Sequence, residues 1–128
     1  MDNGIITMAS PYTVKETVDR LENMLRSKGA AIFTRIDQQA TARLAGLEMP
    51  ATELLLFGNP KAGTALMLAK PLSGLDLPLK VLAWQDKEGK NWLSYNSFGY
   101  LQQRFSLSDD LIHSVALIEG LIKAAVAP

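Results

Sequence analysis

Apolar residues recur at helical spacing near the start of the chain, in the stretch TVKETVDRLENMLRSKG. They follow one another in steps of four, three and four residues, at Val14, Val18, Leu21 and Leu25. This spacing places them on one face of an α-helix. Thr13 and Glu16 have the spacing of a capping box, and Gly29 suits the left-handed residue that ends many helices. The pattern therefore predicts a long amphipathic helix that begins after Thr13 and ends before Gly29.

Several other runs alternate or are continuously apolar, as strands are. A short β-branched run at 5–8 predicts a first strand. In AAIFTRID (30–37) we expect one face to carry Ile32, Thr34 and Ile36, and the other face to carry Ala31, Phe33 and Arg35. ATELLLF (51–57) is apolar enough for the centre of a sheet. LPLKVLAWQDKEGKNWLSYNS (77–97) predicts a β-hairpin that turns at 86–89.

Polar residues that commonly cap helices precede three further stretches. Asp37 precedes QQATARLA, which Gly46 closes, and Asn59 followed by Pro60 predicts a short helix that extends to Lys70. Ser108 predicts a C-terminal helix with one apolar stripe, formed by Leu111, Val115, Ile118 and Ile122. Strands and helices in this order predict an α+β fold: a mainly antiparallel sheet with helices packed on one face, within a single domain spanning 1–128.

Composition and charge exclude several classes of function. Thirteen Lys plus Arg balance thirteen Asp plus Glu, so the chain lacks the positive charge that drives binding to nucleic acid, and no nucleic-acid partner is expected. It has no cysteine, which excludes disulfides and thiol nucleophiles. No secretory signal is evident and no apolar run is long enough to span a bilayer, so we expect a cytoplasmic protein without a membrane partner.

Two stretches carry a family likeness: GAAIFTRIDQQATARLAGLEMPATELLLFGNPKAGTALM and LDLPLKVLAWQDKEGKNWLSYNS. Their most specific parts are the turn LFGNP and the entry to the hairpin, DLPLK. In these motifs the chain resembles the bacterial family called domain of unknown function 302. The resemblance implies a small α+β domain of the TATA-binding-protein-like, helix-grip class, commonly a homodimer, and it implies no reaction.

The FGNP turn raises the main functional question. A helix N-terminus exposes N–H groups that favour an anion, and Lys61 beside Asn59 would add a positive charge. The sequence NPKAG, however, lacks the spacing of a phosphate-binding loop. A structural turn, in which Asn59 caps and Pro60 begins the helix, is the favoured interpretation, and an anion site is the alternative.

The other candidate residues also have structural interpretations. Asp37 and Asp76 could handle a proton, but each suits a cap or a loop. Phe57, Met67 and Tyr95 could line an apolar cavity, although aromatic and Met side chains are more often core. His113, the one histidine, is expected to face solvent. The residues therefore assign no catalytic group, no metal site and no cofactor.

Three functions remain open. The first is a homodimeric, non-enzymatic binding domain for a small apolar or anionic ligand, with Phe57, Met67 and Tyr95 around the ligand and Asn59 or Lys61 at its acidic end. The second is a structural or protein-interaction module. The third is an enzyme acting on a small anionic metabolite, which requires Lys61 to lie near Asp37 or Asp76. We rank them in this order.

Overall fold

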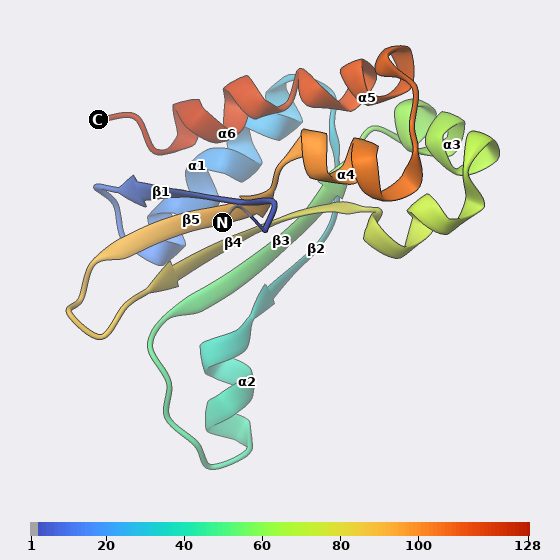
Figure 1. Ribbon diagram of the computed structural model, residues 1–128. Coiled ribbons are helices and arrows are strands. Elements are labelled where there is room, and N and C mark those ends of the chain that lie inside the picture. The colour runs from blue at the N-terminus through green and yellow to red at the C-terminus, as the bar shows by residue number, and fades with distance from the viewer. Residues whose placement is uncertain (1–2) are drawn as a thin grey trace.

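A computed structural model describes residues 3–128 and confirms the predicted α+β architecture (Figure 1). Within this range the five strands are β1 (Ile5–Ser10), β2 (Ala31–Asp37), β3 (Thr52–Gly58), β4 (Leu79–Gln85) and β5 (Asn91–Asn96). The helices are α1 (Val14–Ser27), α2 (Gln38–Leu44), α3 (Pro60–Ala69), the 3-10 helix η1 (Pro71–Asp76), α4 (Phe98–Phe105), α5 (Asp109–Ala116) and α6 (Glu119–Ala125).

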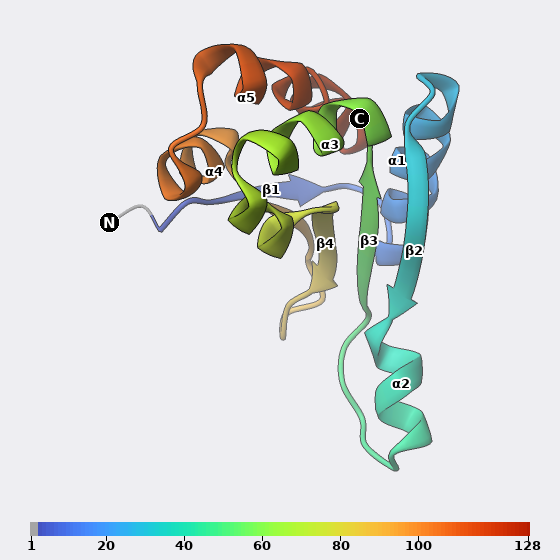
Figure 2. The same ribbon diagram turned by 90° about the vertical axis from the view of Figure 1, so that its right-hand side faces the viewer.

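The strands form one antiparallel sheet in the order β1-β5-β4-β3-β2. The two strands that α1 connects, β1 and β2, therefore lie at opposite edges. Val14 and Lys15, at the start of α1, line a hollow together with Asp37, and Lys28, at its end, lines another together with Asn59. Helix α1 therefore runs along the strands, from the Asp37 end of the sheet to the Asn59 end (Figure 2).

The two faces of the sheet differ. One face packs against α1 and α6 and carries the core, which includes the buried side chains of Leu55, Phe57, Val81, Leu93 and Tyr95. The opposite face, called here the open face, is not covered by these helices (Figure 2). Its large apolar side chains are only partly buried or are exposed; they are Ile5, Ile36, Leu54, Leu56, Leu82, Trp84 and Trp92.

Helix α1 forms as the sequence predicts. Thr13 and Glu16 make a complete capping box, and the predicted apolar stripe is buried. An ionic contact also holds the helix to the sheet: Arg35 on β2 donates to Asp19 of α1 at 2.7 Å and to Glu53 of β3 at 2.6 Å. The helix is therefore fixed by an apolar stripe and by charges beside it.

The remaining helices lie at the two ends of the sheet (Figures 1 and 2). Helix α2 continues from the end of β2, capped by Asp37, which accepts from the Ala40 N–H. Helix α3 and η1 lie at the other end, between β3 and β4. These two ends are separated by the length of the strands, about 17 Å for the residues Glu53 to Gly58.

Three details differ from the sequence prediction. A β-bulge between Ile32 and Thr34 places Ile32 opposite Phe57 on the covered face and Thr34 opposite Leu56 on the open face, so the simple alternation was wrong. Helix α4 was not predicted, although Ser97 caps it through the Tyr100 N–H. The C-terminal helix is interrupted between α5 and α6, where hydrogen bonds span three residues, as from the Ile118 N–H to the Val115 carbonyl.

Candidate functional site

The FGNP turn connects β3 to α3, and its geometry follows from its residues. Asn59 caps the helix: its side-chain oxygen accepts from the Lys61 N–H at 2.9 Å and from the Ala62 N–H at 3.3 Å. Pro60 has no N–H, and the Gly63 N–H donates to the Asn59 carbonyl at 2.8 Å. The first turn of α3 therefore has its N–H groups paired already, which leaves none for an anion.

A pocket of about 310 Å³ lies beside this turn. Four separate segments build it: Phe33 comes from the bulged part of β2, Met67 from α3, Pro78 from the entry to β4, and Val115 from α5. Its surface is mainly apolar. The residues that line it are Phe33, Gly58, Asn59, Pro60, Gly63, Thr64, Met67, Leu77, Pro78, Leu79 and Val115.

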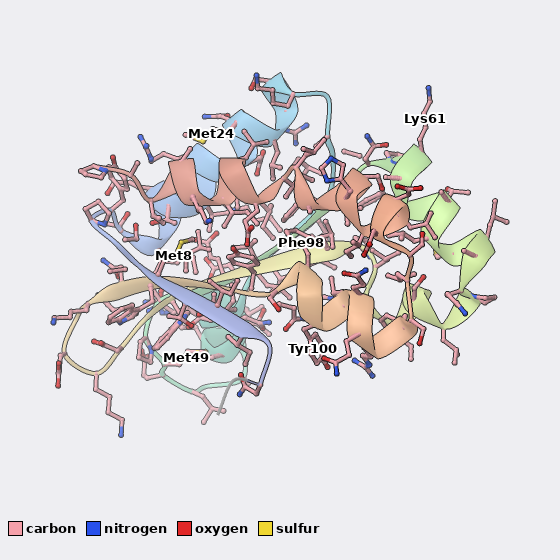
Figure 3. All side chains as sticks on the ribbon, turned by 45° about the horizontal axis from the view of Figure 1, so that its top comes forward. Met8, Met24, Met49, Lys61, Phe98 and Tyr100 are labelled. Carbon is pink, nitrogen blue, oxygen red and sulfur yellow. The ribbon has the colours of Figure 1, made fainter. Side chains whose placement is uncertain are left out.

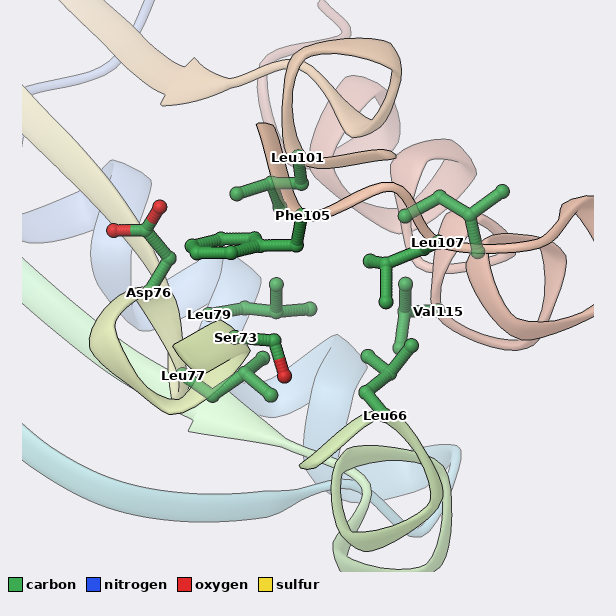
Figure 4. A pocket seen from close by; sticks show the side chains of 10 residues that line it. Leu66, Ser73, Asp76, Leu77, Leu79, Leu101, Phe105, Leu107 and Val115 are labelled. Atoms are coloured by element: carbon green, nitrogen blue, oxygen red, sulfur yellow. The ribbon is translucent and has the colours of Figure 1, made fainter. Parts of the chain in front are cut away.

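A much smaller cavity of about 10 Å³ adjoins the pocket (Figure 4). Leu77, Leu79 and Val115 line both spaces and so separate them. The hydroxyl of Ser73, a residue that is 2% exposed, lies among these apolar side chains. Of the side-chain nitrogen and oxygen atoms in the described residues, Ser73 Oγ is the one buried atom without a hydrogen-bond partner. An unpaired buried hydroxyl costs free energy, and a polar ligand atom would remove that cost.

The structure separates the predicted ligand-binding residues into different places. Asn59 and Met67 line the pocket. Phe57 and Tyr95, at 1% and 5% exposed, belong to the core on the covered face and do not line it. The Tyr95 hydroxyl donates to Glu119 of α6 at 2.6 Å. Burial, and then this hydrogen bond, raises the pKa of Tyr95.

The groups that an enzyme would need are not brought together. Lys61 is exposed at the start of α3 and extends away from the protein (Figure 3). Asp37 lies at the other end of the strands, where it caps α2. Asp76 pairs with Arg104 at 2.9 Å. This arrangement gives no support to proton transfer between Lys61 and either aspartate.

Other chemistry has little structural basis. His113 is exposed on α5, as the sequence predicts. Among residues 3–128 no three His, Cys, Asp or Glu side chains lie together in a way that could hold a metal ion. Within the same residues, every helix is too short or too polar to cross a membrane.

Sequence reasoning missed two residues that line the pocket, Phe33 and Pro78, and also Ser73, which lines the small cavity beside it. Phe33 points toward the pocket only because the bulge changes the alternation of β2, and no feature of AAIFTRID signals a bulge. Pro78 was treated as the entry to a hairpin. Ser73 belongs to η1, a 3-10 helix whose sequence, PLSGLD, reads as a loop. The signal that could have located the site is the unusual apolarity of the segment from 62 to 79.

Comparisons with known proteins agree on the family and the fold. The family model described as Domain of unknown function DUF302 matches residues 6–125. The crystal structure of an uncharacterized conserved protein DUF302 from Bacillus stearothermophilus has a TM-score of 0.79 to this chain at 21% sequence identity. The superposition covers 98% of this chain and 97% of that one, and it shows that the two share a fold.

Two curated relatives match at higher identity. The chain is 48% identical over 107 residues to the Fluoride-specific ion channel FluC 1 of Brucella suis biovar 1, which covers 84% of this chain and 42% of the relative. It is also 48% identical to the Fluoride-specific ion channel FluC 2 of Brucella melitensis biotype 1, of which it covers 40%. The chain therefore spans about two fifths of the length of these relatives.

Proposed function

Because the chain belongs to the family described as Domain of unknown function DUF302, we propose its function from its pocket: it is a non-enzymatic binding domain for a small, mainly apolar ligand. The observation that carries this proposal is the pocket of about 310 Å³ beside the FGNP turn. Its volume is at the lower end of the range for small-molecule sites, and its lining is mainly apolar with a few polar groups, as such sites are.

The surroundings favour a neutral ligand over an anionic one. The N–H groups at the start of α3 are paired within the helix cap, and Lys61 does not line the pocket. Ser73 offers a single buried hydroxyl behind Leu77. The ligand that fits best has an apolar body and one neutral polar group, which would reach Ser73 when the Leu77 side chain moves aside.

Filling the pocket tests this proposal. Gly63 lies in α3 and lines the pocket, and a Cβ placed there meets no atom within 4 Å. Gly63→Trp should therefore fill the space without disturbing the helix, because any other residue except proline favours a helix more than glycine does. Gly120→Trp in α6, which is equally unobstructed, is the matched control.

Nile red, an apolar and uncharged dye, is the probe for this experiment. Its fluorescence is preferable to that of Trp84 and Trp92, which stack on each other near the Asp37 end of the sheet. The Gly63→Trp variant should bind the dye at least about tenfold more weakly than the unmodified chain or Gly120→Trp. Equal affinity in all three proteins would contradict the proposed pocket.

A second candidate function is an accessory domain on the cytoplasmic side of a membrane channel. It is favoured by the 48% identity to parts of proteins named as fluoride-specific ion channels. An accessory role suits this fold better than a pore does, because the described sheet ends in two strands, β1 and β2, that each have an unpaired edge. Unpaired strand edges do not occur next to lipid within the hydrocarbon region.

Deleting the matched 107 residues from the Brucella suis relative tests this role. Fluoride efflux from proteoliposomes should remain measurable after the deletion. If efflux is lost although the shortened protein still inserts into the bilayer, the matched residues belong to the channel itself.

The open face supports a homodimer as the state in which the domain works. Leu54, Leu82 and Trp84 are central in the sheet yet only partly buried. The solvated face of an antiparallel sheet is normally polar, so an apolar face of this kind is typical of a surface that contacts a partner. Leu82→Lys would place a charge in the middle of this face. Sedimentation velocity should show a dimer that this substitution converts to the 14.0 kDa chain. A monomer at micromolar concentration without any substitution would contradict the proposal.

A further inference from the structure

The segment formed by α3 and η1 exposes an unusual apolar surface. Of the ten residues of α3, all of them described, Leu66 alone is buried, although the sequence PKAGTALMLA is apolar over most of its length. A helix that is apolar on all sides is normally buried. The exposed side chains are those of Met67, Leu68, Leu72 and Leu75, at 39%, 81%, 72% and 68%. These four residues are called the apolar tip.

The two elements that carry the apolar tip, α3 and η1, lie together at one end of the molecule (Figure 2). Helix α3 and η1 fold against each other so closely that a Cβ added at Gly74 would lie 3.3 Å from the Met67 sulfur. Met67 also lines the 310 Å³ pocket together with Phe33, which is itself 54% exposed. The apolar surface therefore extends from the tip to the mouth of the pocket.

The helix that carries much of the apolar tip has a positive charge at each end. Lys61 and Lys70 lie at the two ends of α3, and neither forms an ion pair with any residue of the described chain. The segment 60–76 contains one carboxylate, Asp76, which Arg104 neutralises at 2.9 Å. Exposed leucines flanked by unpaired lysines are typical of surfaces that bind an anionic membrane.

We propose that the apolar tip docks on the surface of a lipid bilayer that contains anionic lipids. Leu68, Leu72 and Leu75 would enter the boundary between headgroups and acyl chains, and the two lysines would meet lipid phosphates. The inference rests on the second candidate function, because an accessory domain of a channel works beside a membrane. It also gives an apolar ligand a direct route from the bilayer to the pocket.

The lysines favour a bilayer over a second copy of the chain as the occupant. In a twofold contact the same patch meets itself, so the lysines of both copies would come together and repel each other. With anionic lipids, the interaction of the lysines is attractive instead of repulsive. The sequence predicted no membrane partner because no apolar run could span a bilayer, but a docking surface needs no spanning segment.

Co-sedimentation with vesicles tests the proposal with a matched control in the same chain. Vesicles of phosphatidylcholine are compared with vesicles that also contain phosphatidylglycerol. The variant Leu68→Ser/Leu72→Ser/Leu75→Ser removes the tip leucines. The control, Leu44→Ser/Leu47→Ser, changes leucines that are 91% and 64% exposed at the α2 end of the molecule.

The unmodified chain and the control should bind the anionic vesicles, and the tip variant should bind at least about tenfold more weakly. Lys61→Glu/Lys70→Glu should lose about tenfold on anionic vesicles and little on phosphatidylcholine alone. Absence of binding by the unmodified chain would overturn the proposal. So would equal loss in the tip and control variants.

A separate measurement identifies the competing occupant. If the tip variant dissociates a dimer in sedimentation velocity and the unmodified chain does not bind vesicles, the apolar tip is a contact between copies and the proposal fails. Nile red binding and fluoride efflux do not depend on the leucines of the tip that are substituted, so failure here is distinct from failure of either proposed function.

Discussion

Helices α1 and α3 follow different rules, and the comparison shows how apolar residues can be used. Helix α1 is mainly polar, but its apolar residues fall on one face and are buried, so little apolar surface is left exposed on that helix. Helix α3 is mainly apolar, but its apolar residues occur on all sides, and a single one of its described residues, Leu66, is buried. The spacing of the apolar residues along a helix, and not their number, decides which side chains are buried in the core.

The same substitution in both helices should give the largest difference. Leu25 of α1 is fully buried and Leu68 of α3 is 81% exposed. Leu25→Ala should lower the free energy of unfolding by about 2–5 kcal/mol, because it leaves a cavity. Leu68→Ala should change it by less than about 0.5 kcal/mol. Urea denaturation measures both, and a comparable loss for Leu68→Ala would mean that α3 is covered in the isolated protein.

A smaller effect on the free energy of unfolding is expected from the ionic contact beside α1, which α3 lacks. Arg35→Met removes the partner of Glu53, which is 9% exposed, and should lower the free energy of unfolding by about 2 kcal/mol. Lys15→Met is the control, because its ion pair with Asp19 is exposed and should contribute less than about 0.5 kcal/mol. Equal effects would show that burial of the charges does not matter here.

The same network has a pH dependence with a defined sign. The hydrogen bond from Lys15, and then that from Arg35, lowers the pKa of Asp19 below its ordinary value of 3.8. A carboxyl whose pKa is lowered in the folded state stabilises the protein above the unfolded pKa, and this contribution is lost as the pH falls. Thermal unfolding between pH 5 and pH 2, in the unmodified chain and in Asp19→Asn, should show the variant losing less stability over this range.

The smallest expected effect lies on the α3 side of the molecule and has the opposite sign. Ser73→Ala removes a buried hydroxyl without a partner and should raise the free energy of unfolding by about 1 kcal/mol. Ser114→Ala changes an exposed serine and is the control. If Ser73→Ala is destabilising, its hydroxyl has a partner in solution, such as a water molecule, and a role for it in ligand binding loses support.

The sequence predicted those elements whose signals are local. The capping box of α1, the Asn59–Pro60 start of α3 and the hairpin are each specified by residues that are close in the chain. Helix α4 was missed because its aromatic residues resemble those of the preceding strand. The interruption near Leu117 was missed because its backbone stays close to helical, with only the hydrogen-bond spacing changed.

The candidate site was harder to predict because it depends on tertiary structure. Asn59 and Met67 were assigned to a ligand site and line the pocket, but the pocket forms only where a bulged strand brings Phe33 to the same place. Phe57 is aromatic, as many residues that line apolar pockets are. The alternation of β3, however, turns its side chain toward α1 and α6. Sequence periodicity specifies faces within one element, and it does not specify which elements meet.

The strand order has a consequence for how the chain folds. Ile5 in β1 pairs with Asn96 in β5, whereas β3, β4 and β5 pair with their neighbours in sequence. Closing so long a loop is entropically costly, so the local meander should assemble first and β1 should join it late. During synthesis on the ribosome, β1 emerges before the other four strands of the sheet, and its partner strand β5 is not available until the end of this order. Of these five strands, we therefore expect the first to be synthesised to be the last to join the sheet.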